Sequence, residues 1–263
     1  PPVGPDGLIW SDECDETGSP ASDKWTYDLG SENNGWGNNE QQYYTDKVAN
    51  LSTNGKGQLV IKAIKLDIDN PKDNYITYWC ISCEYSSAKI STRDKLTFKY
   101  GSITVRAMVP QGEGMWPAFW MLGVPRNSCD GWPSCGEIDI MEYVGKNPGE
   151  IHTTLHTPDS FGKSINTRIS KIESIENGFH VYKTKWDANQ IQFYIDDALV
   201  YTFSPEVKNA KTISEILIKS LKKIKKWYKN IIKKSNTKVI KINLSECRNW
   251  QISNKNIKHK TNK

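Results

Sequence analysis

The sequence lacks any apolar run long enough to cross a bilayer, because a transmembrane helix needs about 20 consecutive apolar residues and polar residues interrupt every hydrophobic stretch here. No signal peptide is visible either, but the chain opens at Pro1 without Met. We therefore expect a processed, secreted protein that acts outside the cell. The run Asn50-Leu-Ser52 fits an N-glycosylation acceptor, which agrees with that compartment.

Residues 1–206 also lack an excess of positive charge. They carry 18 Lys and Arg against 28 Asp and Glu, whereas residues 207–263 carry 17 against 2. The formal net charge of +5 therefore hides an acidic main part with a charge of −10. Since phosphate binding depends on a basic surface, we expect no nucleic-acid partner.

Six cysteines are present, and they do not form the two closely spaced pairs of a zinc site. Cys129 and Cys135 bracket a short loop that a disulfide could close, and Cys80 and Cys83 are a second close pair. Half of a zinc site or a redox motif is the alternative for the second pair. Two cysteines stay unassigned, namely Cys14 and Cys247. We expect no metal and no required cofactor.

Short β-rich runs separated by Gly, Pro, Asn and Asp dominate the chain, which is typical of an all-β sandwich or barrel. The predicted strands are residues 58–63, 101–109, 179–186, 190–195 and 199–203. The last three of these predict an antiparallel meander with turns at Asp187 and Asp196. The 10 Trp and 12 Tyr are many for this length and could supply platforms for sugar rings.

Three carboxylates crowd into residues 136–145, within an otherwise apolar, strand-forming run. Side chains alternate between the faces of a strand, so Glu137 and Asp139 share a face, whereas Glu142 breaks the alternation by one residue. A β-bulge near Ile140 or Met141 would return Glu142 to the acidic face. We then expect at least one of the three carboxyls to have a raised pKa, because like charges repel.

Two carboxyl groups about 5–5.5 Å apart, one ionised and one protonated, are what a retaining glycosidase requires. The spacing predicts Glu137 as the nucleophile and Glu142 as the acid/base, with Asp139 tuning the charge of Glu137. A solvated acidic edge strand or a metal site are the alternatives.

Four segments follow one another in an order that resembles glycoside hydrolase family 16, in particular its laminarinase-type endo-β-1,3-glucanases. They are residues 36–44 (WGNNEQQYY), 114–122 (GMWPAFWML), 131–142 (GWPSCGEIDIME) and 152–156 (HTTLH). The resemblance covers roughly residues 8–205. It implies a β-jelly-roll (concanavalin-like) sandwich, a concave cleft and retaining endo-hydrolysis of β-1,3-glucan, with some tolerance of mixed linkages.

The resemblance also implies substrate-binding residues. Trp116 and Trp120 would line the cleft, although core positions are the alternative for both. His156 would orient the acid/base. The remaining implied contacts are Trp132 at the rim, Asn39 (or its neighbour Asn38) on sugar hydroxyls, and Lys89, where laminarinases usually carry Arg. An ammonium cannot reproduce the planar fork of a guanidinium, so we expect weaker binding in one subsite.

The chain departs from the family after residue 205. Residues 1–205 are predicted to be the catalytic sandwich, and residues 206–263 a Lys/Ile/Asn-rich tail in which residues 212–232 form a basic amphipathic helix. Such a helix could bind an anionic membrane, but we favour a shifted reading frame or a retained intron. We expect the tail to lie outside the sandwich as a helix plus disordered chain. The sheet would then be incomplete, and the protein would have little activity.

The function predicted from the sequence is therefore endo-hydrolysis of β-1,3-glucan by a monomer. A β-glucan-binding protein without turnover, or an inactive truncated product, is the first alternative. A protein that acts on membranes through its tail is the second.

Overall fold

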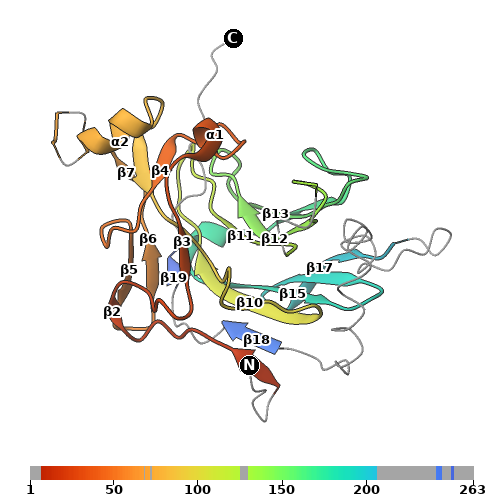
Figure 1. The fold of residues 1–263 in the computed structure, drawn as a ribbon. Coiled ribbons are helices and arrows are strands. Elements are labelled where there is room, and N and C mark those ends of the chain that lie inside the picture. The colour runs from red at the N-terminus through yellow and green to blue at the C-terminus, as the bar shows by residue number, and fades with distance from the viewer. Residues whose placement is uncertain are drawn as a thin grey trace, which may run out of the picture.

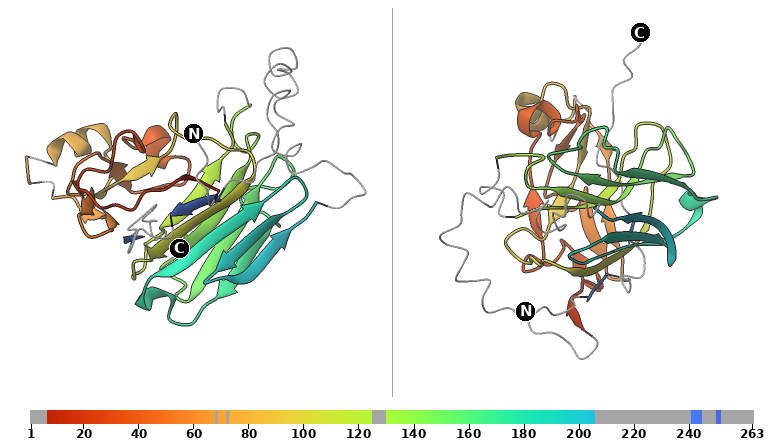
Figure 2. Two further views of the ribbon diagram at one scale, coloured as in Figure 1. Left: turned by 90° about the horizontal axis from the view of Figure 1, so that it is seen from below. Right: turned by 90° about the vertical axis from the view of Figure 1, so that its right-hand side faces the viewer.

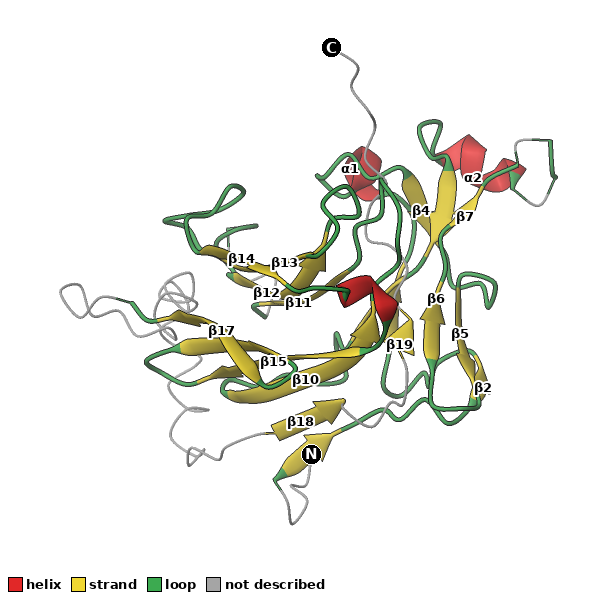
Figure 3. Ribbon diagram, turned by 180° about the vertical axis from the view of Figure 1, so that it is seen from behind, coloured by secondary structure: helices red, strands yellow, loops and turns green. Residues whose placement is uncertain are grey.

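The structure, a computed structural model, describes residues 7–67, 69–71, 73–124, 130–205, 241–244 and 250–251. For residues 33, 34, 74, 241–244 and 250–251 it describes the backbone alone. The described chain is all-β, with helical turns only at α1 (Glu32–Gly35), α2 (Asn74–Trp79) and the 3-10 turn η2 (Ile175–Asn177). Figure 3 shows how far strands outweigh helices.

Two sheets form the body of the molecule. The smaller has the order β11-β12-β13-β14, and all of its pairs are antiparallel. Its strands are β11 (Ala118–Leu122), β12 (Glu137–Tyr143), β13 (Glu150–His156) and β14 (Thr167–Lys171). The right-hand view of Figure 2 shows these green strands stacked above the teal strands of the second sheet.

The second sheet has ten strands and the path β17-β16-β15-β10-β19-β6-β5-β2, with β1 and β18 off that path. Its first part is β1 (Leu8–Trp10), β2 (Thr17–Gly18), β5 (Leu51–Asn54), β6 (Leu59–Ile61) and β10 (Gly101–Met108). Its second part is β15 (His180–Trp186), β16 (Ile191–Ile195), β17 (Ala198–Phe203), β18 (Lys241–Leu244) and β19 (Trp250–Gln251). Strands β15, β16 and β17 form the predicted antiparallel meander.

Two small sheets connect the body to the helices. One pairs β3 (Thr26–Asp28) with β9 (Lys89–Ser91), and the other has the order β4-β8-β7. The strands of the latter are β4 (Gln42–Tyr44), β7 (Ile64–Lys65) and β8 (Tyr85–Ser87). In Figure 1, α1, α2 and β4 lie at the top, on the side of the four-stranded sheet that faces away from β10 and β15.

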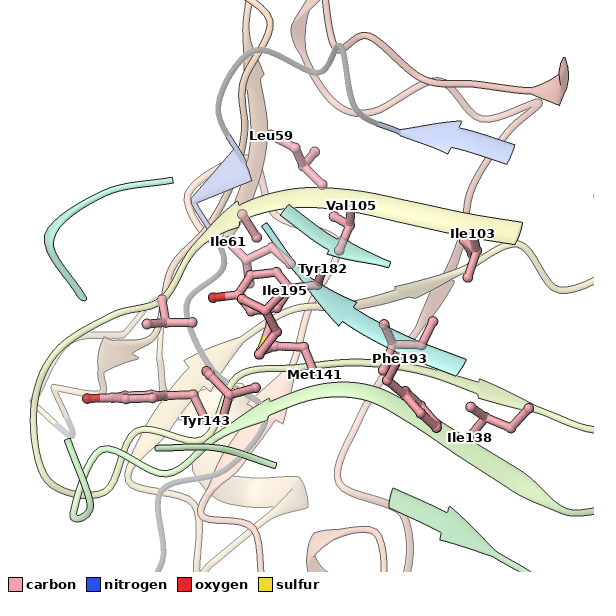
Figure 4. Close-up of a cluster of buried hydrophobic side chains, with 14 of the residues drawn as sticks. Leu59, Ile61, Ile103, Val105, Ile138, Met141, Tyr143, Tyr182, Phe193 and Ile195 are labelled. Carbon is pink, nitrogen blue, oxygen red and sulfur yellow. The ribbon is translucent and has the colours of Figure 1, made fainter. Parts of the chain in front are cut away.

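The core lies between the two sheets (Figure 4). Met141 of β12 points toward Tyr182 of β15, and Phe193 of β16 lies beside Ile138 of β12. Met141, Tyr143, Tyr182 and Phe193 are all fully buried. Burying such a side chain stabilises the fold by about 1.5–3 kcal/mol. One face of β12 thus packs into the core, and the side chains of the opposite face are available for a functional site.

Residues 206–263 are described only at β18 and β19. Both run parallel to β10 along one of its edges; β18 also pairs with β1, and β19 with β6. These six residues are sheet strands, which differs from the expectation that the whole segment lies outside the sandwich. The predicted helix at 212–232 falls outside the described residues.

The cysteine pair Cys80 and Cys83 forms a disulfide, buried in a small cluster with Leu66 and Ile76. This settles the pair as a disulfide rather than a zinc half-site. Cys14 and Cys135 are also disulfide-bonded. Within the described part of the chain, no cluster of His, Cys, Asp or Glu could hold a metal ion, and no described helix has the length and apolar character of a membrane span.

The glycosylation prediction at Asn50 is wrong. This side chain is almost fully buried, and its Nδ2 donates hydrogen bonds to the carbonyl of Lys62 (3.1 Å) and to Oγ of Ser86 (3.0 Å). The nitrogen that would carry a glycan instead joins two strands to each other. A buried amide needs such partners because its desolvation is otherwise costly.

Candidate active site

The acidic strand β12 contains the predicted bulge. Against β13, Asp139 pairs with Thr154 and Glu142 pairs with His152, so three steps along β12 oppose two along β13. The pairing with β11 shifts at the same place. An extra residue therefore sits between Asp139 and Glu142, and the alternation of side chains restarts after it.

The bulge sorts the side chains of β12 between two faces. Ile138, Ile140, Met141 and Tyr143 all belong to the hydrophobic core. Glu137 and Glu142 are partly exposed on the opposite face. Two consecutive core residues, Ile140 and Met141, are possible only because of the bulge, and this returns Glu142 to the acidic face as predicted.

Asp139 and His156 form an ion pair beneath this face. Oδ2 of Asp139 lies 3.1 Å from Nε2 of His156, and Asp139 is almost completely buried. Burial is the largest influence on the pKa of His156 and lowers it, but the hydrogen bond to Asp139 and the charges of Asp139, Glu137 and Glu142 together outweigh it and raise that pKa. All three carboxylates are therefore close enough to stabilise one imidazolium.

Glu137 lies against an aromatic pair. Nε1 of Trp132 donates a hydrogen bond to Oε2 of Glu137 at 2.5 Å. The Trp132 ring lies 5.5 Å from the ring of His156 and 5.4 Å, edge to face, from that of Phe161. About half of the Trp132 surface is exposed. Its indole thus borders the acidic face, at the position expected for a rim residue.

Glu142 has a corresponding indole donor at the other end of the acidic face. Nε1 of Trp116 donates to Oε1 of Glu142 at 3.0 Å. The loop that carries Trp116 packs closely on the end of β12, since a Cβ on Gly145 would lie 1.8 Å from the carbonyl oxygen of Gly112. A glycine at 145 is therefore required for this approach. Trp116 is partly exposed rather than a core residue.

Trp120 and Lys89 extend the site toward the N-terminal part of the chain. Trp120 pairs directly with Asp139, which places its side chain on the acidic face, whereas its neighbours Phe119 and Met121 pack against the core. The ammonium of Lys89 lies 5.2 Å from the centroid of Trp120 and 3.8 Å from that of Trp36. A carboxylate oxygen of Asp28 is 3.6 Å away.

Asn39 is the predicted site residue that the structure does not connect to the others. It is exposed in the turn between α1 and β4, with a left-handed backbone (φ 57°). In the described part of the chain its side chain makes no hydrogen bond or ion pair. Its neighbour Asn38 donates to Glu40 at 3.3 Å. A role for either amide in sugar binding stays a prediction.

Two aromatic residues of the site, Phe161 and Trp36, were not predicted from the sequence. Phe161 is a lone aromatic in the polar loop between β13 and β14, and it is half exposed against Trp132. The ring of Trp36 contacts the ammonium of Lys89, which also lies near Trp120. A single aromatic residue in a turn-rich loop could have indicated a binding role for Phe161. Its partner Trp132, however, comes from a different loop and could not be inferred from the sequence.

Comparison with known proteins gives matches over most of the chain. The profile of glycosyl hydrolases family 16 matches residues 33–243, beyond the limit of 205 inferred from the motifs. The β-glucanase of Rhodothermus marinus is 38% identical over 205 residues, covering 76% of this chain and 66% of that protein. The glucan endo-1,3-β-glucosidase A1 of Niallia circulans is 36% identical over 214 residues, which are 76% of this chain and 30% of that protein.

A solved structure is also similar. The crystal structure of a laminarinase from Flavobacterium sp. UMI-01 matches with a TM-score of 0.66 and 42% identity, covering 76% of this chain and 80% of that one. The chain thus spans less than two thirds of the length of the two curated relatives and most of the length of this crystallised one.

Proposed function

The chain belongs to glycosyl hydrolases family 16, and from this membership we propose that it hydrolyses internal β-1,3 linkages of glucans with retention of configuration. The observation that carries the proposal is the bulge of β12, because it gathers Glu137, Asp139 and Glu142 on one face. The glucanase names of the related proteins support β-glucan as the substrate.

In the first step, the carboxyl group of Glu142 donates its proton to the glycosidic oxygen while Glu137 attacks the anomeric carbon. The bond from that carbon to the leaving oxygen breaks, and a glycosyl-enzyme ester forms on Glu137. Trp132 already donates to Oε2 of Glu137. That hydrogen bond fixes the carboxylate and leaves Oε1 as the attacking atom.

In the second step, Glu142, now a carboxylate, takes a proton from water, and the oxygen of that water attacks the anomeric carbon. The ester bond breaks and Glu137 leaves as a carboxylate. Two inversions give a product with the β configuration. The Trp116 indole holds Glu142 in place for both proton transfers.

Asp139 and His156 act as positioning residues. The imidazolium of His156 compensates the buried charge of Asp139 and part of the charge of the two glutamates. A pair of carboxylates that must differ in protonation benefits from a fixed positive charge close by.

The aromatic side chains around the carboxylates bind the sugar rings. Trp116, Trp120 and Trp132 present rings on or beside the acidic face. Lys89, near Trp36 and Trp120, is a donor for sugar hydroxyls at one end. Asn39 remains a candidate in the neighbouring turn.

The two packed sheets and the family match support a jelly-roll sandwich. We propose that residues 1–205 hold all of the catalytic residues and that 206–263 is a separate segment whose contribution to the sandwich is strands β18 and β19. We further propose a secreted monomer that needs no cofactor. These proposals are compatible with the disulfides.

The test is the anomeric form of the first product. The protein is incubated with laminarin, and proton NMR follows the anomeric signals before mutarotation equilibrates them. The β anomer should appear first, together with new reducing ends. Initial α anomer would overturn the retaining assignment, and binding without any reducing ends would favour the glucan-binding alternative.

A further inference from the structure

The segment around α2 exposes several large apolar side chains on a rigid base. Tyr78, Trp79 and Ile81 are 78%, 71% and 95% exposed, and Tyr75 is exposed to a lesser degree. The rings of Tyr78 and Trp79 contact edge to face at 5.3 Å. We call these four residues the α2 aromatic surface.

The base of this surface is well fixed. Ile76 is almost fully buried in the cluster that contains the Cys80–Cys83 disulfide. The ring of Tyr75 packs edge to face on Tyr43 at 6.2 Å, and the ammonium of Lys47 lies 4.5 Å from its centroid. Exposed aromatic side chains on a fixed base lose little entropy on binding a ligand, so they suit recognition. Soluble proteins expose such clusters mainly at binding sites.

Strand β4 connects the α2 aromatic surface to the candidate active site. Tyr43 of this strand contacts Tyr75, whereas the next residue, Tyr44, contacts the ring of Trp36 at 5.8 Å. Trp36 in turn holds Lys89, which lies beside Trp120 on the acidic face. Figure 1 shows α2, β4 and α1 along the same upper side of the molecule. Tyr43 and Tyr44 point to opposite faces of β4, so a polymer that leaves the active site at the Lys89 end would have to pass the end of this strand to reach α2.

We propose that the α2 aromatic surface is a second β-glucan-binding site, which holds the substrate chain outside the catalytic face. This inference rests on the proposed glucanase function. The apolar faces of the sugar rings would stack on Tyr78 and Trp79, and their hydroxyls would reach the Tyr78 hydroxyl and the Trp79 indole N–H. Such a site increases the local concentration of a long or insoluble substrate at the active site.

A membrane is a poorer occupant for this surface. Asp67, Asp69 and Asp73 immediately precede α2, and the side chains of Asp67 and Asp73 cap backbone N–H groups of this loop. Residues 65–73 carry three Asp and two Lys, a net charge of −1, so the segment is not the Lys- and Arg-rich surface that anionic lipid headgroups attract. A neutral glucan needs no such positive charge.

The experiment compares the full-length protein with the double variant Tyr78→Ala/Trp79→Ala. Binding to insoluble β-1,3-glucan is measured by sedimentation in a Glu137→Gln background, so that the polymer is not degraded. We expect affinity to fall about 10-fold, equivalent to about 1.4 kcal/mol. In the background with Glu137 intact, kcat/KM on a soluble β-1,3-linked tetrasaccharide should stay within about twofold of the parent, because that substrate is too short to reach α2.

Leu199→Ala is the control, since Leu199 is also a half-exposed apolar residue but lies on β17 of the ten-stranded sheet, away from α2. It should change neither measurement. If the double variant does not fold, as judged by lost tetrasaccharide turnover, Trp79→Ala alone replaces it, with an expected loss of about fivefold. Unchanged binding of insoluble glucan by a variant that still cleaves the tetrasaccharide overturns this inference and leaves the proposed function intact.

Two further outcomes would also overturn the inference. In one, the double variant loses binding to phosphatidylcholine/phosphatidylserine vesicles that the parent protein binds, while its glucan binding is unchanged. In the other, the parent protein is a dimer and the double variant is a monomer, again with unchanged glucan binding. If the parent neither cleaves the tetrasaccharide nor binds glucan, the proposed function itself has failed.

Discussion

Nε2 of His156 lies 3.1 Å from Oδ2 of Asp139, and this ion pair lies under the two glutamates of the acidic face. An almost fully buried carboxylate is costly unless a positive charge or hydrogen bonds compensate it. The folded protein therefore favours the protonated form of His156.

The raised pKa of His156 makes stability depend on pH. Its contribution is fully present below the unfolded pKa of 6.5 and is lost as the pH rises through the higher folded value. The melting temperature of the parent should therefore exceed that of His156→Gln by more at about pH 6 than at about pH 9. Equal differences at both pH values would contradict the assignment, and an NMR titration of the imidazole would measure the folded pKa directly.

The two glutamates should be separable by their kinetics. Glu137→Gln and Glu142→Gln should each lower kcat on laminarin by several orders of magnitude while leaving the melting temperature nearly unchanged, because both side chains are partly exposed. For an aryl glycoside whose leaving group needs no protonation, Glu142→Gln should retain glycosyl-enzyme formation and accumulate the ester. Mass spectrometry of the quenched protein detects that ester, and Glu137→Gln is the negative control.

Trp116 should contribute to function rather than to folding. A buried Trp truncated to Ala costs about 3–5 kcal/mol, whereas the partly exposed Trp116 should cost clearly less in a urea titration. Trp116→Ala should weaken glucan binding. Trp116→Phe keeps a ring but removes the donor to Glu142, so it should lower kcat more than it raises KM. A large loss of stability with unaltered affinity would place Trp116 in the core.

Lys89 should affect binding more than turnover. Lys89→Met removes the ammonium near Trp36 and Trp120 while keeping most of the apolar stem, so KM for laminarin should rise with kcat nearly constant. Asp28 keeps an ion pair with Arg93 at 2.7 Å, so the fold should persist. Lys89→Arg should restore or improve binding, because a guanidinium donates two parallel hydrogen bonds. An unchanged KM in both variants would exclude Lys89 from the substrate site.

The segment after residue 205 can be tested by deletion. Strands β18 and β19 cover one edge of β10, so removing residues 206–263 should expose that edge, lower the melting temperature and promote self-association. Light scattering and thermal unfolding measure both effects. A truncated protein that is more soluble and more active would instead support the sequence-based interpretation that this segment disturbs the sandwich.

Several features of the protein follow from the sequence alone, because they depend on neighbours along the chain. The broken alternation among Glu137, Asp139 and Glu142 predicted the bulge, since a strand has a period of two. The meander of β15–β17 and the pairing of Cys80 with Cys83 are likewise local. The family resemblance implied that Trp120 lines the cleft, and its pairing with Asp139 places it on the acidic face.

Only the tertiary structure decided which distant side chains meet. Asn50 matches a glycosylation acceptor, yet the packing of two strands buries its amide. Phe161 reaches Trp132, and Trp36 reaches Lys89, across long separations in sequence. Such contacts depend on how loops from different strands close over the sheet. That closure is fixed by the summed packing of the layers, which no local pattern encodes.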